Sequence, residues 1–182
     1  MNKEFNPERL HVAAFAQSGA SYSGEQRLAR FVRLIEETQG LGGEGWVTYT
    51  AQGEMRTDAA SVNEVWLHLV GQASLPLVCQ RCLGPVDIPV AFDRYFRFVA
   101  SEELAAIEDE ESEEDVLVLC KDFNLLELLE DELLMAMPAA PAHDVCPVAV
   151  QFQVADPDFE EETTKKPNPF ALLAALKKSE SP

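Results

Sequence analysis

The chain has 182 residues, 47% of them hydrophobic, which suits one domain with an ordinary hydrophobic core and appended segments. Its 32 acidic residues against 14 basic ones give a formal net charge of −18, which disfavours broad electrostatic binding to nucleic acid and favours basic proteins as charged partners. No stretch approaches the length of apolar sequence that spans a membrane, and the first residues lack the apolar core of a signal peptide, so we expect a cytoplasmic protein without membrane contact.

The N-terminal part is predicted to contain one amphipathic helix. The first 20 residues show little pattern, whereas apolar residues recur at helical spacing between 25 and 39. Ser23 with Gln26 resembles a capping box at the start of this segment, and the glycines from Gly40 onward would end it. We therefore expect a helix over 25–39.

From Trp46 the pattern becomes that of β-strands. Segments 46–50, 65–70 and 86–92 are rich in β-branched and aromatic residues, and glycine and proline separate them. Residues 95–99 continue the last of these runs. Because nothing long enough for a helical crossover lies between the segments, we expect an antiparallel meander or a small barrel over 46–99.

An acidic segment follows the strands. Residues 102–115 hold nine acids in fourteen positions, which predicts a solvated, mobile loop, with a docking arm for a basic partner as the alternative. A short strand is expected at 116–119. Asn124 would then cap a helix from Leu125 to about Met137, and this helix is apolar over most of its circumference, so it should be buried against the sheet.

These elements predict an α+β fold, in which an antiparallel β-meander or small barrel is packed by two helices, with a short C-terminal helix. We expect residues 1–145 to form this single domain and residues 146–182 to form a linker and a C-terminal docking segment. Asn168 and Pro169 are a cap and a first-turn residue for the last helix.

The sharpest local feature is the pair Cys79-Gln-Arg-Cys82 together with His143-Asp-Val-Cys146. Thiolates and an imidazole at this spacing suit a structural zinc ion. One alternative is a reduced dithiol with a structural role. The other is a thioredoxin-like redox pair, although such a pair begins a helix and this one is followed by Leu-Gly-Pro and a strand. We expect Cys120 to be a core thiol that binds no metal.

Basic residues offer a second kind of candidate site. Arg27, Arg30 and Arg33 recur every third residue and would line one edge of the first predicted helix, as a solvated face or as a patch that faces phosphates. Arg81 lies between two cysteines in a tight turn, from which it would reach a phosphate or a carboxylate. The chain has no P-loop, GxGxxG or GxSxG motif, so we expect no enzyme and no small-molecule substrate.

Three stretches together resemble the YceD family, the large ribosomal RNA subunit accumulation proteins. They are Leu77-Val-Cys-Gln-Arg-Cys-Leu-Gly-Pro-Val86, the acidic and apolar helix from Leu125 to Pro138 that runs into Pro141-Ala-His-Asp-Val-Cys146, and the terminal Lys166-Pro-Asn-Pro-Phe-Ala-Leu-Leu-Ala-Ala-Leu-Lys177. Gly84 departs from the family pattern, since a charged residue is expected there. By match to the family motifs, the resemblance marks Cys79, Gln80, Arg81, Cys82, His143, Cys146, Pro167, Asn168, Pro169 and Phe170.

The resemblance implies a non-catalytic accessory role in the synthesis, processing or stability of 23S ribosomal RNA in the bacterial cytoplasm. We expect the chain to act by binding either ribosomal RNA or a basic ribosomal or assembly protein, and the net charge favours the protein. The segment around Phe170 would dock on a partner or pack on its own domain. The alternative function is a thiol-dependent redox protein centred on Cys79 and Cys82.

Overall fold

The computed structural model describes residues 5–57, 62–110 and 112–149, all within one compact unit that ends at Ala149. The predicted C-terminal helix and docking segment, including Pro167 to Phe170, lie outside the described residues. The predicted domain boundary between residues 145 and 146 therefore stays a prediction. No helix among the described residues is long and apolar enough to cross a membrane.

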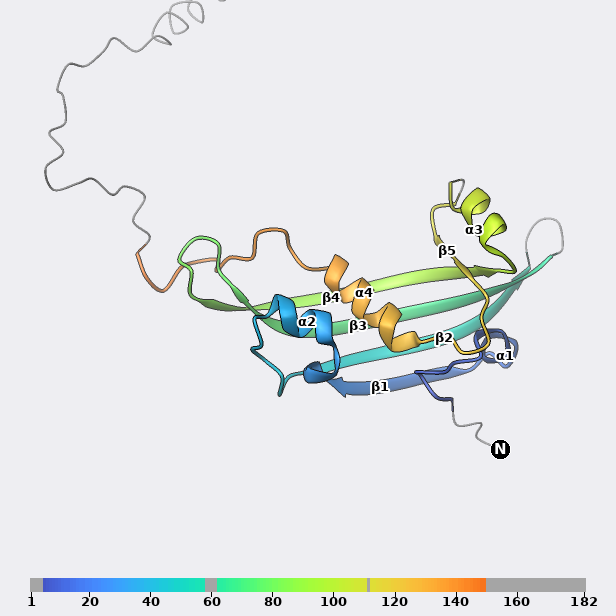
Figure 1. Ribbon diagram of the computed structural model, residues 1–182, viewed down its shortest axis with the longest axis horizontal. Coiled ribbons are helices and arrows are strands. Elements are labelled where there is room, and N and C mark those ends of the chain that lie inside the picture. The colour runs from blue at the N-terminus through green and yellow to red at the C-terminus, as the bar shows by residue number, and fades with distance from the viewer. Residues whose placement is uncertain (1–4, 58–61, 111, 150–182) are drawn as a thin grey trace, which may run out of the picture. The chain divides into compact units, whose positions relative to one another are not determined.

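Five strands form one open sheet in the order β1-β2-β3-β4-β5 (Figure 1). They are β1 Ser21–Arg27, β2 Trp46–Thr57, β3 Asn63–Val78, β4 Pro85–Val99 and β5 Asp115–Val118. Strands β1 to β4 are antiparallel neighbours, and the short β5 pairs in parallel with the end of β4. The predicted α+β class and antiparallel meander are confirmed. The alternative of a barrel is not, because the sheet does not close.

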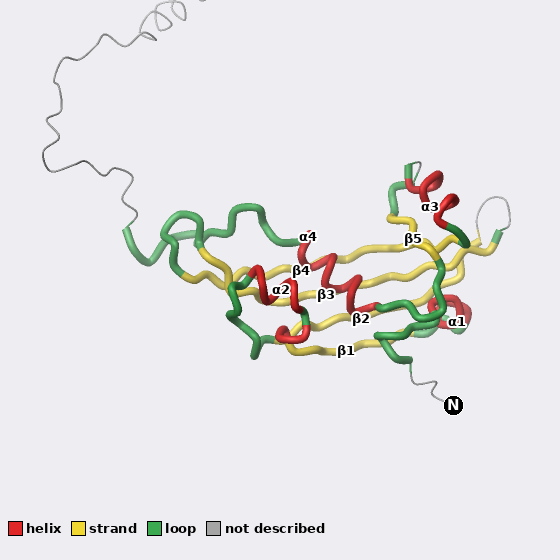
Figure 2. The backbone as a smooth tube through the Cα atoms, viewed as in Figure 1, coloured by secondary structure: helices red, strands yellow, loops and turns green. Residues whose placement is uncertain are grey.

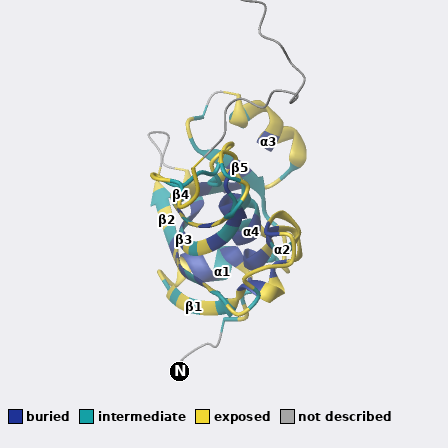
Figure 3. Ribbon diagram, turned by 90° about the vertical axis from the view of Figure 1, so that its left-hand side faces the viewer, coloured by how far each residue is buried: buried dark blue, intermediate teal, exposed yellow. Residues whose placement is uncertain are grey.

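The described helices are α1 Val12–Gln17, α2 Val32–Glu37, α3 Glu102–Asp109 and α4 Leu125–Met135, with a 3₁₀ turn η1 at Leu28–Arg30. Helices α1, α2 and α4 lie on one face of this sheet, and α3 lies at its β5 edge (Figures 2 and 3). Alternate residues of the long strands face this layer: β2 buries Val47, Tyr49 and Ala51, whereas Thr50 and Gln52 are exposed. The core therefore lies between the sheet and the helices, and the other face of the sheet meets solvent.

Two glycines let the helices approach the sheet closely. A Cβ atom at Gly53 would lie 2.7 Å from the backbone nitrogen of Ala16 and 2.6 Å from the ring of Phe15, both on α1. A Cβ atom at Gly71 would lie 2.6 Å from a methyl group of Leu129 on α4. At Gly53 the backbone of α1 leaves no room for a side chain, so this position sets how near α1 lies to β2. At Gly71 the neighbouring atoms are side-chain atoms of Leu129 and, at 2.5 Å, of Phe92 on β4, and these would have to move to admit a methyl group.

Helix α4 begins where the sequence predicts. The side-chain oxygen of Asn124 accepts hydrogen bonds from the backbone N–H groups of Leu126 at 3.2 Å and Glu127 at 3.4 Å. The leucines on its inner face are fully or almost fully buried, namely Leu125, Leu126, Leu129 and Leu133. The predicted capped and buried helix is confirmed.

The same helix carries a buried carboxylate, Glu130, that caps α2. Helix α2 has no side-chain cap of its own at Phe31. One oxygen of Glu130 accepts from the backbone N–H groups of Arg33 at 2.8 Å and Leu34 at 3.3 Å, and the other accepts from the Arg33 guanidinium at 3.0 Å. A carboxylate at a helix N-terminus pairs with the free N–H groups there, so Glu130 fixes α2 against α4.

The predicted helix over 25–39 is wrong in its first half. Ser21–Arg27 is strand β1, whose backbone pairs with β2, and only Val32–Glu37 is α-helical. The capping box does not form, because the Ser23 hydroxyl lies 3.1 Å from that of Thr50 across the sheet. Pairing with a long neighbouring strand outweighs a local helical pattern in this segment.

The acidic segment is also more regular than predicted. Residues Glu102–Asp109 form α3, although a loop was expected over 102–115. The Ser101 hydroxyl accepts from the backbone N–H of Leu104 at 3.3 Å and caps the helix. Arg97 forms an ion pair with Glu108, which offsets part of the repulsion among the acids.

Replacing Gly53 by alanine should destabilise the protein by about 1–3 kcal/mol, because the backbone of α1 must move to admit the new methyl group. Urea unfolding of the two proteins measures this loss. Gly43→Ala is the matched control, since the nearest atom to its added carbon would be at an ordinary 3.5 Å. Equal stability of the Gly53→Ala and Gly43→Ala proteins would show that α1 does not lie as closely on β2 as described.

A second buried carboxylate of α4, Glu132, gives the fold a pH dependence. Burial raises the pKa of Glu132, and the Arg94 guanidinium, 3.9 Å away, opposes that rise only in part. Because its folded-state pKa lies above that of the unfolded chain, the folded state holds the Glu132 proton more tightly. The ionisation of Glu132 therefore lowers the free energy of unfolding as the pH rises from the unfolded-state pKa to the folded-state pKa of this group.

The Glu132→Gln protein should accordingly gain stability relative to the wild type as the pH rises above the ordinary glutamate pKa of about 4.3, because glutamine stays neutral. The gain should level off above the folded-state pKa of Glu132. Urea unfolding of both proteins from about pH 4 to about pH 8 measures the difference. Glu36→Gln, at an exposed position of α2, controls for the general loss of one carboxylate. A difference that is the same at every pH would contradict the assignment.

Candidate metal centre

The turn between β3 and β4 holds the first pair of cysteines. Two backbone hydrogen bonds close it: the N–H of Cys79 donates to the carbonyl of Gly84, and the N–H of Leu83 donates to the carbonyl of Cys79, each at 2.9 Å. Leu83 adopts a left-handed conformation with φ of 58°. In this tight turn the sulfur atoms of Cys79 and Cys82 lie within 4.8 Å of each other.

The second pair arrives on the loop that follows α4. The backbone N–H of Gln80 donates to the carbonyl of Pro141 at 2.8 Å, and the guanidinium of Arg81 donates to the carbonyl of Asp144 at 3.3 Å. These bonds hold the loop against the cysteine turn, although the two segments are far apart in the sequence. The residues between the cysteines thus position the second pair.

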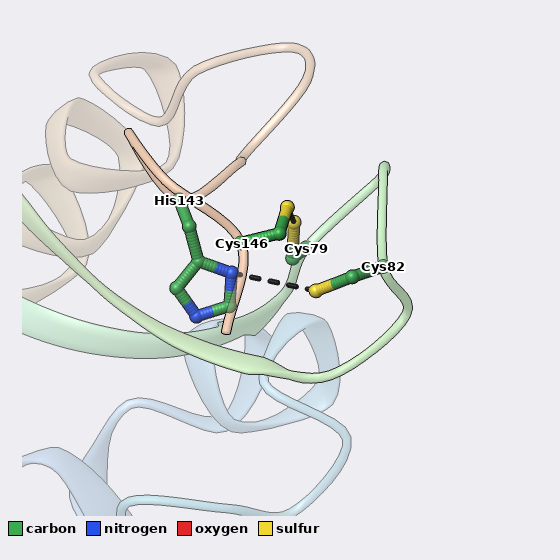
Figure 4. A group of neighbouring side chains, drawn as sticks. All are labelled: Cys79, Cys82, His143 and Cys146. Atoms are coloured by element: carbon green, nitrogen blue, oxygen red, sulfur yellow. Dashed lines mark hydrogen bonds between the residues drawn. The ribbon is translucent and has the colours of Figure 1, made fainter. Parts of the chain in front are cut away.

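Cys79, Cys82, His143 and Cys146 converge from the turn and the loop (Figure 4). The sulfur atoms of Cys79 and Cys146 are 3.9 Å apart, and the sulfur of Cys82 lies 3.5 Å from Nδ1 of His143. All four donor atoms lie within 4.8 Å of one another. Cys79 is fully buried and the other three are partly buried. The cluster offers three sulfur ligands and one nitrogen ligand and could hold a metal ion.

The surroundings of the cluster favour a thiolate at Cys79. Burial acts to raise the pKa of Cys79, but hydrogen bonds from the backbones of Cys82, His143 and Arg81 outweigh it and lower the pKa to about 5. At Cys146, burial and the neighbouring Cys82 and Cys79 raise the pKa to about 11. Backbone groups of the turn and of the loop therefore stabilise a negative charge on the sulfur of Cys79 in particular.

The fourth cysteine takes no part in this cluster. Cys120 lies beyond the end of β5 and is exposed, so the predicted core thiol is wrong. The apolar neighbours that suggested burial belong to a segment that leaves the sheet at Val118. A substitution at Cys120 can therefore serve as a control for substitutions of the three cysteines in the cluster.

The three arginines predicted to share a helix edge lie on different elements. Arg27 ends β1, Arg30 lies in η1 and Arg33 lies in α2. Each one is engaged within the protein. Arg27 pairs with Glu44 and lies over the ring of Trp46, Arg30 pairs with Glu8, and Arg33 pairs with Glu130 and Asp131.

Two residues that position the site were not identified as functional from the sequence. Pro141 and Asp144 act through their backbone carbonyl groups, which receive the hydrogen bonds from Gln80 and Arg81. A carbonyl acceptor is common to every residue type and leaves no signal in the sequence. Pro141 and Asp144 stand in the stretch that resembles the YceD family, but the resemblance gives their carbonyl groups no role.

Comparison with known proteins identifies the family of this chain. The family model described as "Large ribosomal RNA subunit accumulation protein YceD" matches residues 67–177, which include all four residues of the cluster. A Haemophilus influenzae protein with the same name is 36% identical over 164 residues, covering 89% of this chain and 90% of that protein. No solved structure matches the chain significantly. The chain therefore belongs to the YceD family of large ribosomal RNA subunit accumulation proteins.

Proposed function

We propose that this chain is a non-catalytic cytoplasmic factor that promotes the accumulation of large-subunit ribosomal RNA by binding a basic ribosomal or assembly protein. The name of the Haemophilus influenzae relative supports the ribosomal role. The distribution of charge over the described residues supports a protein, and not RNA, as the direct partner.

The observation that carries this choice is that the protein neutralises its own arginines. Seven of the eight arginines form ion pairs with carboxylates of the same chain. The partners are Asp122 for Arg9, Glu44 for Arg27, Glu8 for Arg30, Glu130 and Asp131 for Arg33, Glu54 for Arg56, Asp115 and Glu132 for Arg94, and Glu64 and Glu108 for Arg97.

This pairing leaves little positive charge for phosphates. Lys121 is the one lysine within the described residues. A protein that binds RNA through its backbone needs several free cations to displace the condensed counterions. Among the arginines and lysines of residues 5–57, 62–110 and 112–149, only Arg81 and Lys121 have no carboxylate partner among the ion pairs. The surplus carboxylates instead present a negative surface, which attracts a basic partner at long range.

A structural zinc ion in the cysteine and histidine cluster belongs to this proposal. Zinc binds thiolates at about 2.3 Å and imidazole at about 2.0–2.1 Å in a tetrahedron, so two sulfur ligands should lie about 3.8 Å apart and a sulfur and a nitrogen about 3.5 Å apart. The separations in the structure, 3.9 Å between the sulfur atoms of Cys79 and Cys146 and 3.5 Å between the sulfur of Cys82 and Nδ1 of His143, agree with those edges. The four residues would hold the ion and so join the loop to the turn.

The alternative of a thiol-dependent redox protein has less support. A reactive thiol must be accessible to its substrate, whereas Cys79 is fully buried. The cysteine pair also lies in a turn between two strands, and not at the start of a helix as in thioredoxin-like proteins.

The purified full-length protein should bind one zinc ion per chain, and Cys146→Ser should weaken this binding by more than about 100-fold, because losing a direct ligand costs more than losing its supporting contacts. Native mass spectrometry and competition with a colorimetric chelator measure both quantities. Cys120→Ser is the matched control and should bind as the wild type does. Zinc binding that survives in the Cys146→Ser protein would exclude this ligand set.

Cells that lack this gene should contain less 23S relative to 16S ribosomal RNA, with 23S precursors accumulating, since the proposed role is specific to the large subunit. Quantitative northern analysis of total RNA gives the ratio. A plasmid copy of the gene should restore it, and an empty plasmid is the control. If the ratio is unchanged in cells without the gene, the proposed function is wrong.

A further inference from the structure

The cysteine turn exposes apolar side chains beside the candidate metal centre. Leu83, directly after Cys82, is 77% exposed, and Val145, directly before Cys146, is 86% exposed. These are the two most exposed large apolar residues in the described part of the chain. Because Cys82 and Cys146 belong to one cluster, their neighbours Leu83 and Val145 lie at the same end of the β3–β4 hairpin. We name Leu83, Val145 and Arg81 the turn tip.

The backbone at Leu83 is held in an unfavourable conformation. Its φ of 58° lies in the left-handed region, which glycine and asparagine occupy far more readily than leucine. The turn would therefore be easier to form with either of those residues, and an exposed leucine gains nothing from burial in return. A strained backbone that presents an exposed apolar side chain suggests a role in binding.

The third member of the turn tip is the exception among the arginines. Within the described residues, Arg81 has no carboxylate partner, and its guanidinium donates to the backbone carbonyl of Asp144. A guanidinium has five N–H donors, so most of them stay available. Such donors suit backbone carbonyl oxygens of an extended segment, and arginine beside apolar residues is typical of the centre of a protein interface.

We propose that the turn tip is the docking point for an extended, basic segment of the partner protein, which places a large apolar side chain against Leu83 and Val145. This inference rests on the proposed function and specifies where the basic partner binds. The exposed carboxylates of Asp87 and Asp144 beside the tip would pair with lysine or arginine residues that flank the apolar residue.

The same features argue against RNA as the occupant of the turn tip. A single available guanidinium neutralises about one phosphate, and the nearby Asp87 and Asp144 would repel the next ones along the strand. Two aliphatic side chains also lack the flat faces on which unpaired bases stack. A peptide segment uses all three residues of the tip, whereas RNA uses one.

The test is binding of the full-length, zinc-loaded protein to purified large-subunit ribosomal proteins, taken one at a time, and to naked 23S ribosomal RNA, by fluorescence anisotropy. Leu83→Asn is the main variant, because asparagine tolerates the left-handed backbone and should preserve or raise the melting temperature while it removes the apolar contact. Val145→Ser is the second variant. Ile107→Ser is the matched control, since Ile107 is 62% exposed on α3, beyond the opposite end of β4.

We expect at least one basic protein of the set to bind the wild type, and we expect Leu83→Asn and Val145→Ser each to weaken that binding about tenfold or more while Ile107→Ser leaves it unchanged. Wild-type affinity in both tip variants, or no binding by any protein of the set, would overturn the proposal. So would binding to naked 23S ribosomal RNA that weakens in the tip variants, since it would identify RNA as the occupant.

A second readout separates the failure of this inference from that of the proposed function. In cells without the chromosomal gene, a plasmid copy with Leu83→Asn should fail to restore the ratio of 23S to 16S ribosomal RNA. Full restoration by that copy would refute the docking point and leave the proposed function intact. A ratio that never changes on deletion would refute the proposed function itself.

Discussion

The close contact of α4 with β3 at Gly71 is the constraint on which the rest of the structure depends. Leu129 of α4 and Phe92 of β4 together occupy the space that a side chain at Gly71 would need, and the absence of that side chain lets the leucine-rich face of α4 lie directly on the sheet. The helix then carries Glu130 to the start of α2, and the chain that leaves its end carries His143 and Cys146 back to the cysteine turn. One helix position thus sets both the second helix and the candidate metal centre.

Charge pairing within the protein follows from the same arrangement. Glu130 is buried because α4 is buried, and a buried carboxylate needs hydrogen-bond partners, which Arg33 and the first N–H groups of α2 supply. Arg97 of β4 similarly meets Glu64 of β3 and Glu108 of α3. The arginines therefore serve the fold, and the acids left over determine the charge of the surface.

Sequence patterns predicted the elements whose signals are local. The cap at Asn124, the buried face of α4 and the strands at 46–50, 65–70 and 86–99 have signals in neighbouring residues, and all were confirmed. Ser21–Arg27 was misassigned because the apolar residues that follow it, such as Leu28 and Phe31, keep helical spacing, while the strand's partner begins only at Trp46. The free energy that β1 gains by pairing with β2 depends on residues 46–52, further along the chain, so the pattern within residues 21–27 does not reveal it.

The candidate site also has features that the sequence predicted and features that it did not. The four candidate ligands were predicted from residue type and spacing, since thiolates and imidazole in such pairs suit a metal ion, and the structure brings all four together. The hydrogen bonds that bring the pairs together were not, since the acceptors are the backbone carbonyls of Pro141 and Asp144. The exposure of Leu83 and Val145 to solvent could not be predicted either, because a single leucine or valine outside a periodic pattern can be buried or exposed.

Under both proposals, metal and partner act on the same short segment. The turn tip is built from the residues beside the ligands, so a metal ion that holds the loop to the turn also holds Leu83 and Val145 in their relative positions. Ordering these residues before the partner arrives lowers the entropy lost on binding. By thermodynamic linkage, the partner must then strengthen metal binding by the same factor by which the metal strengthens partner binding. A strained, exposed leucine is tolerable in such a turn because the metal–ligand bonds, and not the local backbone preference, would determine its conformation.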